Sequence, residues 1–545
     1  MRIGLVRRGS RASTPRRLRL LALGLAGTIA LTACGSASGS DSGDQVLRIA
    51  MSAGNIPYPA TPPNEGYEGY RFVGNNIYDA LTRLNLDQAE ELPTPQPSLA
   101  ESWESSEDLT TWTFKLREGV KFHDGTDFNA DAVIFQFDRM RNPDFEFYSA
   151  TDAGRGAAAF RFISGWEKVD DYTVTIRTSQ PYAWVPWDVA SIYIPSPTKV
   201  KEVGNDAYNQ FATGTGPFVM TEYVDGEVME LTRNDDYWGN VPKLDKIVLY
   251  PQAEAASRFA ALTSGEVDWA EVPAPDSIAQ LEAEGFNIQL GKYPHGIMPR
   301  FNQFRAPFKD NLALRQALNF ALDREGTAAL INDVGYPASQ WVYDGHPAFD
   351  VDNSSGYTYD VEKAKKLLAE SGTQPGTLKL TMAYPTGGSG NMFPDVMMQK
   401  LQADFAAIGV DVTLEPMEWN TLLTASLEGL DKPQWQHIDI LWASPAAGMM
   451  PSLYSTAFMC VLPGGSPNAS GMCNQQATDA LLAAAQQPDV ADQDRYLQDM
   501  MGAAVDNADF LFWMHDLNLR VLSPRVQGYV HPQSWWVDFT TISME

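Results

Sequence analysis

Histidine and cysteine are scarce in this chain, which has six histidines and three cysteines among 545 residues. The histidines are scattered and show no metal-ligand spacing: His123, His295, His346, His437, His515 and His531. The sequence also lacks a Gly-x-Ser-x-Gly, a His-Glu-x-x-His and a Walker phosphate loop, so hydrolysis by those sites and ATP use are unsupported. A glycosidase stays open, because paired carboxylates have no fixed spacing. We expect no catalytic residues, no metal and no cofactor.

Basic residues are also few, with 40 Lys and Arg against 68 Asp and Glu and a formal net charge of −28. Seven arginines precede Cys34 with no acid among them, and removing them lowers the net charge from −28 to about −35. Such an acidic body repels the phosphates of nucleic acid, so we expect no nucleic-acid partner. With 14 Trp and 25 Phe the chain is not disordered, and its length suffices for two lobes with separate cores.

The N-terminus has the pattern of an export signal. An arginine-rich stretch leads into an apolar run over 18–31, which is too short for a comfortable membrane span. The run closes on Leu31-Thr32-Ala33-Cys34, which matches the bacterial lipobox, whose cysteine is lipidated and becomes the first residue. We therefore expect a lipoprotein signal peptide over 1–33, lipidation at Cys34 and a flexible Gly/Ser-rich tether over 34–45.

The two remaining cysteines, Cys460 and Cys473, flank a loop rich in Pro and Gly. Export places them in an oxidising compartment, where a pair closing a short loop forms a disulfide. A metal site is the alternative, but no histidine is near and two thiolates alone are a poor ligand set. The sequence thus predicts a Cys460–Cys473 disulfide.

In the first half of the chain, strands are predicted over 46–50, 111–116 and 172–176, where apolar and polar residues alternate. Apolar periodicity predicts a helix over 73–84. Asn129 is a suitable N-cap for a helix that continues through Phe137. Trp112, Phe114 and Leu116 are interpreted as sheet packing, and 123–125 as a turn.

The second half alternates between helix and strand. Leu314, Ala317, Leu318 and Ala321 share one face of a predicted helix within 310–324. A second helix is expected over 361–371, between Asp360 and Gly372. Strands at 377–383 and 410–414 flank a helix from about 394 to 409, and this β-α-β order favours a parallel sheet covered by helices.

Several ordered segments resemble the family 5 extracellular solute-binding proteins, the dipeptide, oligopeptide and nickel receptors of ATP-driven importers. They are 97–104, 112–125, 128–133, 137–139, 214–218, 234–238, 265–268, 308–310, 315–318, 323–324 and 359–368. No single motif identifies the family, but the order and spacing hold from about residue 47 to the C-terminus.

The resemblance implies an α/β fold of two lobes, each with mixed sheets flanked by helices, and a ligand cleft between the lobes. Lobe I would comprise 46–293 and 517–545, and lobe II would comprise 294–516. Closure around a small solute would create the state that an importer recognises. The implied role is the extracytoplasmic, membrane-anchored receptor of an importer whose permease and ATPase are separate chains. We expect a monomer; a ligand-sensing lipoprotein is an alternative with the same fold.

The solute is less well defined, because the end anchors of the dipeptide branch are missing. That branch binds the peptide amino group with an acid shortly after a Trp, whereas 440–478 contains no charged residue or histidine. It holds the carboxylate with an Arg before Pro-Tyr, and here the strand ends Tyr384-Pro385 without an Arg. A buried unpaired ionic group is costly, so a dipeptide held by its ends is disfavoured.

Three ligand classes therefore remain: longer peptides, which we favour, then oligosaccharides, then nickel chelates. The candidate ligand-binding residues are Trp442, Tyr384, Trp419, Ser444 and Gly216. Trp442 and Tyr384 rank first because they lie in the family's ligand-lining segments, and we expect replacement of Trp442 by Ala to weaken binding without lowering the stability of the unliganded protein. Trp419 and Trp435 could stack on sugars. The backbone N–H groups of 214–216 could face a ligand or form a tight turn.

Overall fold

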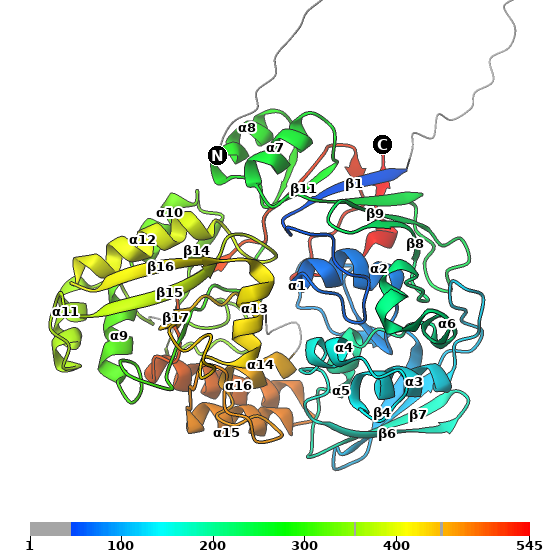
Figure 1. The fold of residues 1–545 in the computed structure, drawn as a ribbon, viewed down its shortest axis with the longest axis horizontal. Helices are drawn as coiled ribbons and strands as arrows, with labels where there is room; N and C mark the ends of the chain where they lie inside the picture. The colour runs from blue at the N-terminus through cyan, green and yellow to red at the C-terminus, as the bar shows by residue number, and fades with distance from the viewer. Residues whose placement is uncertain (1–44, 354–355, 447–450) are drawn as a thin grey trace, which may run out of the picture. The chain divides into compact units, whose positions relative to one another are not determined.

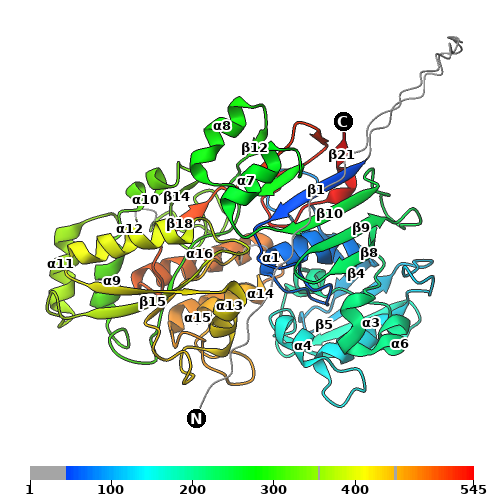
Figure 2. The same cartoon turned by 45° about the horizontal axis from the view of Figure 1, so that its top comes forward.

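A seven-stranded mixed sheet gathers strands from distant parts of the chain. In this computed structural model, which describes residues 45–353, 356–446 and 451–545, the strand order is β12-β19-β11-β1-β10-β9-β8. The strands are β1 Val46–Met51, β8 Phe218–Val224, β9 Val228–Arg233, β10 Lys246–Pro251, β11 Trp269–Glu271, β12 Asn287–Gln289 and β19 Arg520–Leu522. β1 runs parallel to β10, beside which it lies in Figure 2, and to β11. β19 pairs with both β11 and β12. The C-terminal segment thus returns to the sheet that the first strand begins.

A second sheet is antiparallel, with the order β4-β5-β7-β6. Its strands are β4 Ala100–Ser105, β5 Thr111–Leu116, β6 Ile163–Asp170 and β7 Thr173–Thr178, and α3 Ala130–Arg141 packs on it. Trp112, Phe114 and Leu116 alternate into the core, as predicted. Asn129 caps α3 by accepting a hydrogen bond from the Asp131 N–H, which confirms the predicted helix start.

A third sheet holds the predicted β-α-β unit. Its order is β13-β17-β15-β16, from β13 Arg300–Phe301, β15 Lys379–Pro385, β16 Asp411–Met417 and β17 Ile440–Leu441. β15 is parallel to both β16 and β17, and α12 Pro394–Ala407 connects β15 to β16. The predicted helices appear as α9 Leu312–Ala321, followed by α10 Arg324–Leu330, and α11 Val361–Glu370, which Asp360 caps (Figure 1). Leu314, Ala317, Leu318 and Ala321 are all fully buried.

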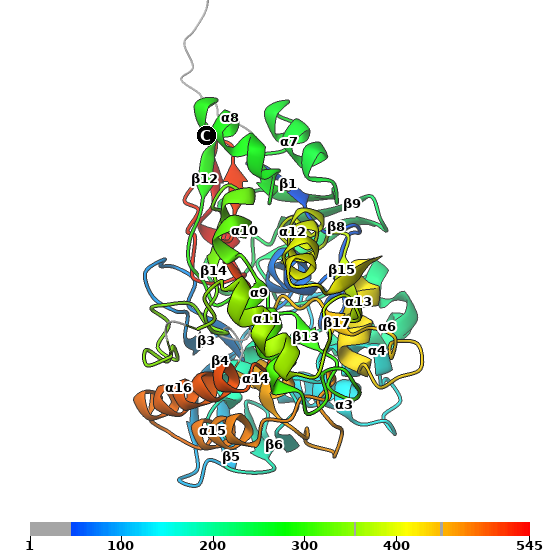
Figure 3. The same cartoon turned by 90° about the vertical axis from the view of Figure 1, so that its left-hand side faces the viewer.

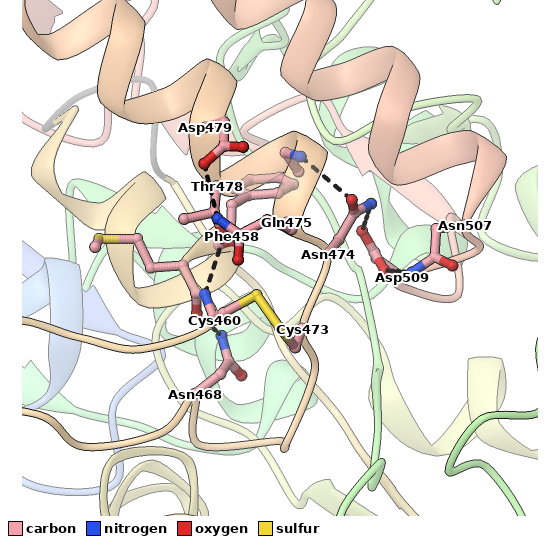
Figure 4. The surroundings of a disulfide bond; sticks show 12 residues. Phe458, Cys460, Asn468, Cys473, Asn474, Gln475, Thr478, Asp479, Asn507 and Asp509 are labelled. Atoms are coloured by element: carbon pink, nitrogen blue, oxygen red, sulfur yellow. Dashed lines mark hydrogen bonds between the residues drawn. A yellow bond between two sulfur atoms is a disulfide. The ribbon is translucent and has the colours of Figure 1, made fainter.

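The predicted disulfide is present between Cys460 and Cys473 (Figure 4). It closes a loop between α14 Ser452–Phe458 and α15 Gln475–Ala485. The Thr478 hydroxyl accepts a hydrogen bond from the Cys460 N–H, and α15 packs along α16 Val490–Asp506 (Figure 3). The disulfide therefore fixes a loop without regular structure against a helical pair.

The helix predicted over 73–84 is wrong. Helical structure instead begins at α1 Gly66–Glu68, continues as a π-helical turn over Gly69–Gly74 and ends with α2 Asn75–Ile77, while Thr82–Leu84 is strand β2. Apolar residues recur across this stretch because it is buried on most sides, so the periodicity does not report one helix. π-helical turns are frequent at functional sites.

The remaining elements connect these sheets. They are β3 Pro95–Pro97, α4 Ala150–Arg155, α5 Val185–Asp188, α6 Pro197–Ala207, α7 Ala255–Thr263, α8 Ile278–Ala283, β14 Gly335–Pro337, α13 Trp419–Glu428, β18 Met514–Asp516, β20 Val526–Gln527 and β21 Ser543–Met544. No helix in 45–353, 356–446 or 451–545 has both the length and the apolar character that a membrane crossing needs. The predicted signal peptide over 1–33, Cys34 and all of the tether except Gln45 lie outside the described residues.

Candidate functional site

Four of the five candidate residues lie at or near the carboxyl edge of the third sheet. Tyr384 is near the end of β15, Trp442 and Ser444 follow β17, and Trp419 begins α13 just after β16. The Trp442 N–H bonds to the Ala383 carbonyl, so Tyr384 and Trp442 lie on neighbouring strands. Ligands of parallel α/β sheets bind outside this edge.

The Trp442 side chain is occupied by contacts within the protein. It is fully buried, its Nε1 donates to Asn391 Oδ1 at 2.8 Å, and its ring stands edge-on to Trp513 at 5.8 Å between centroids. The Ser444 hydroxyl donates to the same Asn391 oxygen at 3.2 Å. These contacts make Trp442 a core residue of this structure as much as a candidate ligand contact.

Tyr384 and Trp419 are also largely buried. The Tyr384 hydroxyl donates to Asp395 Oδ1 at 2.8 Å. Trp419 is 9% exposed, and its ring lies so close to Gly388 that a Cβ there would stand 2.6 Å from Trp419 Cγ. Gly388 has a φ of 99°, so glycine at this position serves both the backbone conformation and the close approach of the indole.

Gly216 is in a different environment from the other four candidates. Its N–H donates to the Ile77 carbonyl at 3.0 Å, and its carbonyl accepts from His123 Nε2 at 3.0 Å and Asn234 Nδ2 at 3.1 Å. The backbone of Gly216 is therefore occupied by hydrogen bonds within the protein. His123 lies in the predicted turn, where the Gly125 N–H donates to the Phe122 carbonyl.

A cavity of about 450 Å³ opens between the loop that precedes α1, the end of α4 and the exposed face of α13. The residues that define it include Tyr58, Glu65, Tyr70, Arg155, Asn420 and Leu423. Its volume lies within the range of small-ligand sites, and its wall combines aromatic, amide and charged side chains. Among the five candidates chosen from sequence, none lines this cavity.

Glu65 is the most unusual residue of the cavity wall. It is 1% exposed and has a φ of 60° and a ψ of 28°, a left-handed conformation uncommon for a residue with a side chain. Its Oε1 accepts hydrogen bonds from Asn420 Nδ2 at 2.8 Å and Asn64 Nδ2 at 3.3 Å. Burial raises the pKa of Glu65 to about 7; the Asn420 hydrogen bond opposes this rise, and the Glu418 carboxylate adds to it. Strained backbone and a shifted pKa at one residue are features of functional sites.

Arg155 supplies a positive charge to the same cavity. It is the last residue of α4, is half-buried, and has its guanidinium carbon 5.9 Å from the centre of the Tyr58 ring. Neither Glu65 nor Arg155 has an oppositely charged side chain within 4 Å among the residues the structure describes. The cavity therefore carries one acidic and one basic group, each without an ionic partner in the described part of the chain.

Buried ion pairs hold the helical segment that follows Glu65. Glu68 accepts hydrogen bonds from the Ser52 and Ala53 N–H groups, and Arg71 pairs with Glu271 at 2.5 Å. Burial raises the pKa of Glu68 and lowers that of Arg71. The Glu68 N–H donates to Ser389 Oγ at 3.0 Å, which ties this segment to the loop after β15. Buried networks of ion pairs and hydrogen bonds of this kind fix backbone position.

Two other buried acids have raised pKa values but are occupied by the protein. Burial raises the pKa of Asp79 to about 6, and its carboxylate accepts from Thr215, Tyr237 and Trp238. Burial raises that of Asp188 to about 8, and the Tyr182 hydroxyl donates to it at 2.8 Å. Within 45–353, 356–446 and 451–545, no three His, Cys, Asp or Glu side chains are arranged to hold a metal ion.

Sequence reasoning missed Glu65 and Arg155. Glu65 lies in the Pro- and Gly-rich stretch after the first strand, and the turn-forming Asn64-Glu65-Gly66 was the one available signal of an unusual backbone. Arg155 carries no signal, because a basic residue in the last turn of a helix is ordinary. The two are 90 residues apart, and only the folded chain brings them to one cavity.

Comparison with known proteins gives consistent results. Residues 94–459 match the sequence profile of the bacterial extracellular solute-binding proteins, family 5. The chain is 27% identical over 532 residues to the dipeptide-binding protein of Escherichia coli strain K12, covering 92% of this chain and 96% of that protein. It is 28% identical over 566 residues to heme-binding protein A of Haemophilus influenzae, covering 95% and 98%.

A solved structure shares the fold. It is the dipeptide-binding protein of a Pseudoalteromonas species in complex with Met-Leu, with a TM-score of 0.80 and 22% identity, covering 92% of this chain and all of that one. The predicted α/β fold class and the resemblance drawn from the sequence motifs are thereby confirmed.

Proposed function

Because the chain belongs to the family 5 bacterial extracellular solute-binding proteins, we propose that it captures peptides outside the cytoplasm and delivers them to an ATP-driven importer. The observation that carries this proposal is the cavity beside α13, whose wall contains the side-chain amides of Asn55 and Asn420, groups suited to hydrogen bonding with a peptide. Relatives named for dipeptide binding support the ligand class.

The proposed mechanism uses two lobes, 46–293 with 517–545 and 294–516. Strand pairing supports this division, because β19 joins β11 and β12 while β13, β15, β16 and β17 form a separate sheet. We assign Glu65 and Arg155 to the first lobe and Asn420 to the second, and with this division the cavity is lined by residues of both lobes. The Asn420–Glu65 hydrogen bond joins them directly, and a ligand held there stabilises the closed state.

The test is isothermal calorimetry of the full chain with peptides of two to five alanines, maltotriose, heme and a nickel–histidine chelate. We expect heat of binding with the peptides alone. Binding of maltotriose without peptides would reassign the protein as an oligosaccharide receptor, and binding of heme alone would align it with the Haemophilus relative. Incubated peptides should stay intact by mass spectrometry, because a receptor performs no chemistry.

Membrane attachment and partners complete the proposal. Cleavage after residue 33 leaves Cys34 lipidated, and the tether through residue 45 lets a monomeric body reach a permease that works with a separate ATPase. The lipobox at 31–34 supports this. Cys34→Ser should move the protein from the membrane to the soluble fraction on cell fractionation while calorimetric affinity stays unchanged. Retention of the variant in the membrane would contradict the lipid anchor.

A further inference from the structure

We propose that Glu65 and Arg155 bind the two charged ends of a zwitterionic peptide, with the ligand ammonium on Glu65 and its carboxylate on Arg155. This inference rests on the proposed function and identifies the chemistry of its site. It also changes an expectation from the sequence, since the anchoring charges stand on segments other than the 440–448 stretch, where the dipeptide branch carries its acid.

The first argument is placement. Both side chains line the cavity of about 450 Å³, Glu65 from the loop before α1 and Arg155 from the end of α4. Asn420 and Leu423 of α13 contribute to the wall, so a ligand there contacts three separate segments. A ligand with opposite charges at its ends matches a cavity with opposite charges on its walls.

The second argument is the missing ionic partner. Two other deeply buried acids pair with arginines: Glu271 lies 2.5 Å from Arg71, and Asp152 lies 2.5 Å from Arg139. The buried acids Asp79 and Asp188 have no arginine within 4 Å among the described residues and accept hydrogen bonds from side-chain donors of the protein. Glu65 is equally buried, yet the partners that the structure describes for it are the amides of Asn64 and Asn420. Leaving a buried carboxylate without a cation is costly, and a ligand ammonium removes that cost.

The third argument is rigidity. The Tyr58 N–H donates to Asn64 Oδ1 at 2.6 Å, which closes the loop that presents Glu65. Gly69 permits the return of this loop, because a Cβ there would stand 1.9 Å from the Asn64 carbonyl oxygen. The carboxylate is thus held in place before a ligand arrives, and a preorganised anchor loses less entropy on binding than a mobile one.

The charge state of Glu65 gives the site a distinctive pH dependence. Burial is the largest cause of the raised pKa of Glu65. The groups that act on its carboxyl are the Asn420 amide and Arg155, which lower the pKa, and the carboxylates of Glu418 and Glu68, which raise it. Because the pKa of Glu65 is raised to about 7, its carboxyl titrates near neutral pH. An ammonium favours the ionised form, so ligand binding near pH 7 should release protons.

The experiment is calorimetry of trialanine binding to the full chain in two buffers of different ionisation enthalpy. We expect Glu65→Gln to weaken binding at pH 7.5 by about tenfold or more, the usual effect of losing a charge-assisted hydrogen bond. We also expect proton release in the wild type and none in Glu65→Gln. Arg155→Gln should weaken binding to a similar degree while keeping the proton release.

Ligand variants assign each end. N-acetyl-trialanine should bind Glu65→Gln and the wild type with equal affinity, because this ligand has no ammonium for Glu65 to bind. Trialanine amide should bind Arg155→Gln and the wild type alike. Glu254→Gln is the control: Glu254 precedes α7, makes no cap hydrogen bond there and is not among the residues that line the cavity, so we expect a change below about threefold.

The outcomes separate this inference from the proposed function. If the wild type and Glu65→Gln bind peptide with equal affinity, Glu65 does not bind the ligand ammonium. The same holds if the wild type binds peptide without releasing a proton. In both cases the proposed peptide receptor is unaffected. Tight binding of N-acetyl-trialanine amide by the wild type has the same consequence. Failure of every peptide, with binding of maltotriose or heme, overturns both.

Discussion

Two segments of the chain contrast in how they contribute to the molecule, the uncharged stretch 440–478 and the charged loop 55–70. The first contains no charged residue or histidine and places Trp442 in the core and a disulfide in its loop. The second lines the cavity with Glu65, and its Glu68 joins Arg71 and Glu271 in a buried ionic network. The family's binding chemistry drew attention to the first segment, whereas the unpaired charge is on the second. If Glu65 anchors the ligand as proposed, stability and recognition divide between these two segments.

The substitution with the largest expected effect is Trp442→Ala, which tests the role of the 440–478 segment in stability. Removing a fully buried indole leaves a cavity beside Trp513 and takes one of two hydrogen bonds from Asn391 Oδ1, so we expect a loss of about 3–5 kcal/mol in the free energy of unfolding. This differs from the expectation drawn from the sequence, which kept the stability of the unliganded protein nearly constant. Urea denaturation followed by tryptophan fluorescence measures it.

Trp442→Phe is the matched control, since it keeps an aromatic ring against Trp513 and loses the hydrogen bond to Asn391. Its cost should be about 1–2 kcal/mol. If Trp442→Ala instead unfolded at the wild-type urea concentration but bound trialanine far more weakly, Trp442 would be a ligand contact after all. The two segments would then share the recognition role.

The second test removes the disulfide through the paired change Cys460→Ser and Cys473→Ser. Closing a short loop restricts the unfolded chain, so the double variant should lose about 2–4 kcal/mol of stability. Because the loop takes no part in the cavity wall, the calorimetric Kd for trialanine should stay within about twofold. The control is the wild type, unfolded under reducing conditions. A large change in the Kd of the fully folded double variant would show that the disulfide loop also affects ligand binding.

The sequence predicted most of the elements on which this comparison depends. The β-α-β unit from β15 to β16, the caps of α3 and α11 and the disulfide all follow from local patterns, because each is determined by neighbouring residues. The helix predicted over 73–84 failed because that segment is buried on several sides, so its apolar residues do not mark one face. The cavity could not be predicted, since Glu65, Arg155 and Asn420 meet through long-range packing alone.

The third test is the effect of Glu65→Gln on stability. We expect this substitution to raise the free energy of unfolding, although it weakens ligand binding. The folded pKa of Glu65, about 7, lies above its usual value of 4.5, so ionising Glu65 destabilises the folded protein. Wild-type stability should therefore fall as the pH rises from about 4.5 to about 7 and level off above. At pH 8, Glu65→Gln should be more stable than wild type by about 1–3 kcal/mol.

Denaturation at pH 4 and pH 8 measures this difference, which should be close to zero at pH 4, where Glu65 is protonated in both states. Glu254→Gln is the control, because Glu254 precedes α7 and its side chain makes no cap hydrogen bond there. Lower stability of Glu65→Gln at pH 8 would mean that the carboxylate stabilises the loop and is not held at a cost for binding.

The smallest expected effect belongs to Asn420→Ala, which removes the hydrogen bond between α13 and Glu65. The Asn420 amide donates to Glu65 Oε1 at 2.8 Å and lowers the pKa of that carboxyl, so its removal should move the pKa upward from about 7. A larger protonated fraction at pH 7 should then weaken trialanine binding by about threefold, with little change at pH 8.5. Calorimetric Kd values from pH 6 to pH 8.5 give the midpoint, and Asn55→Ala, which alters another cavity amide, should leave it in place. A midpoint that moves downward or stays fixed would show that Asn420 holds the loop without tuning the charge of Glu65.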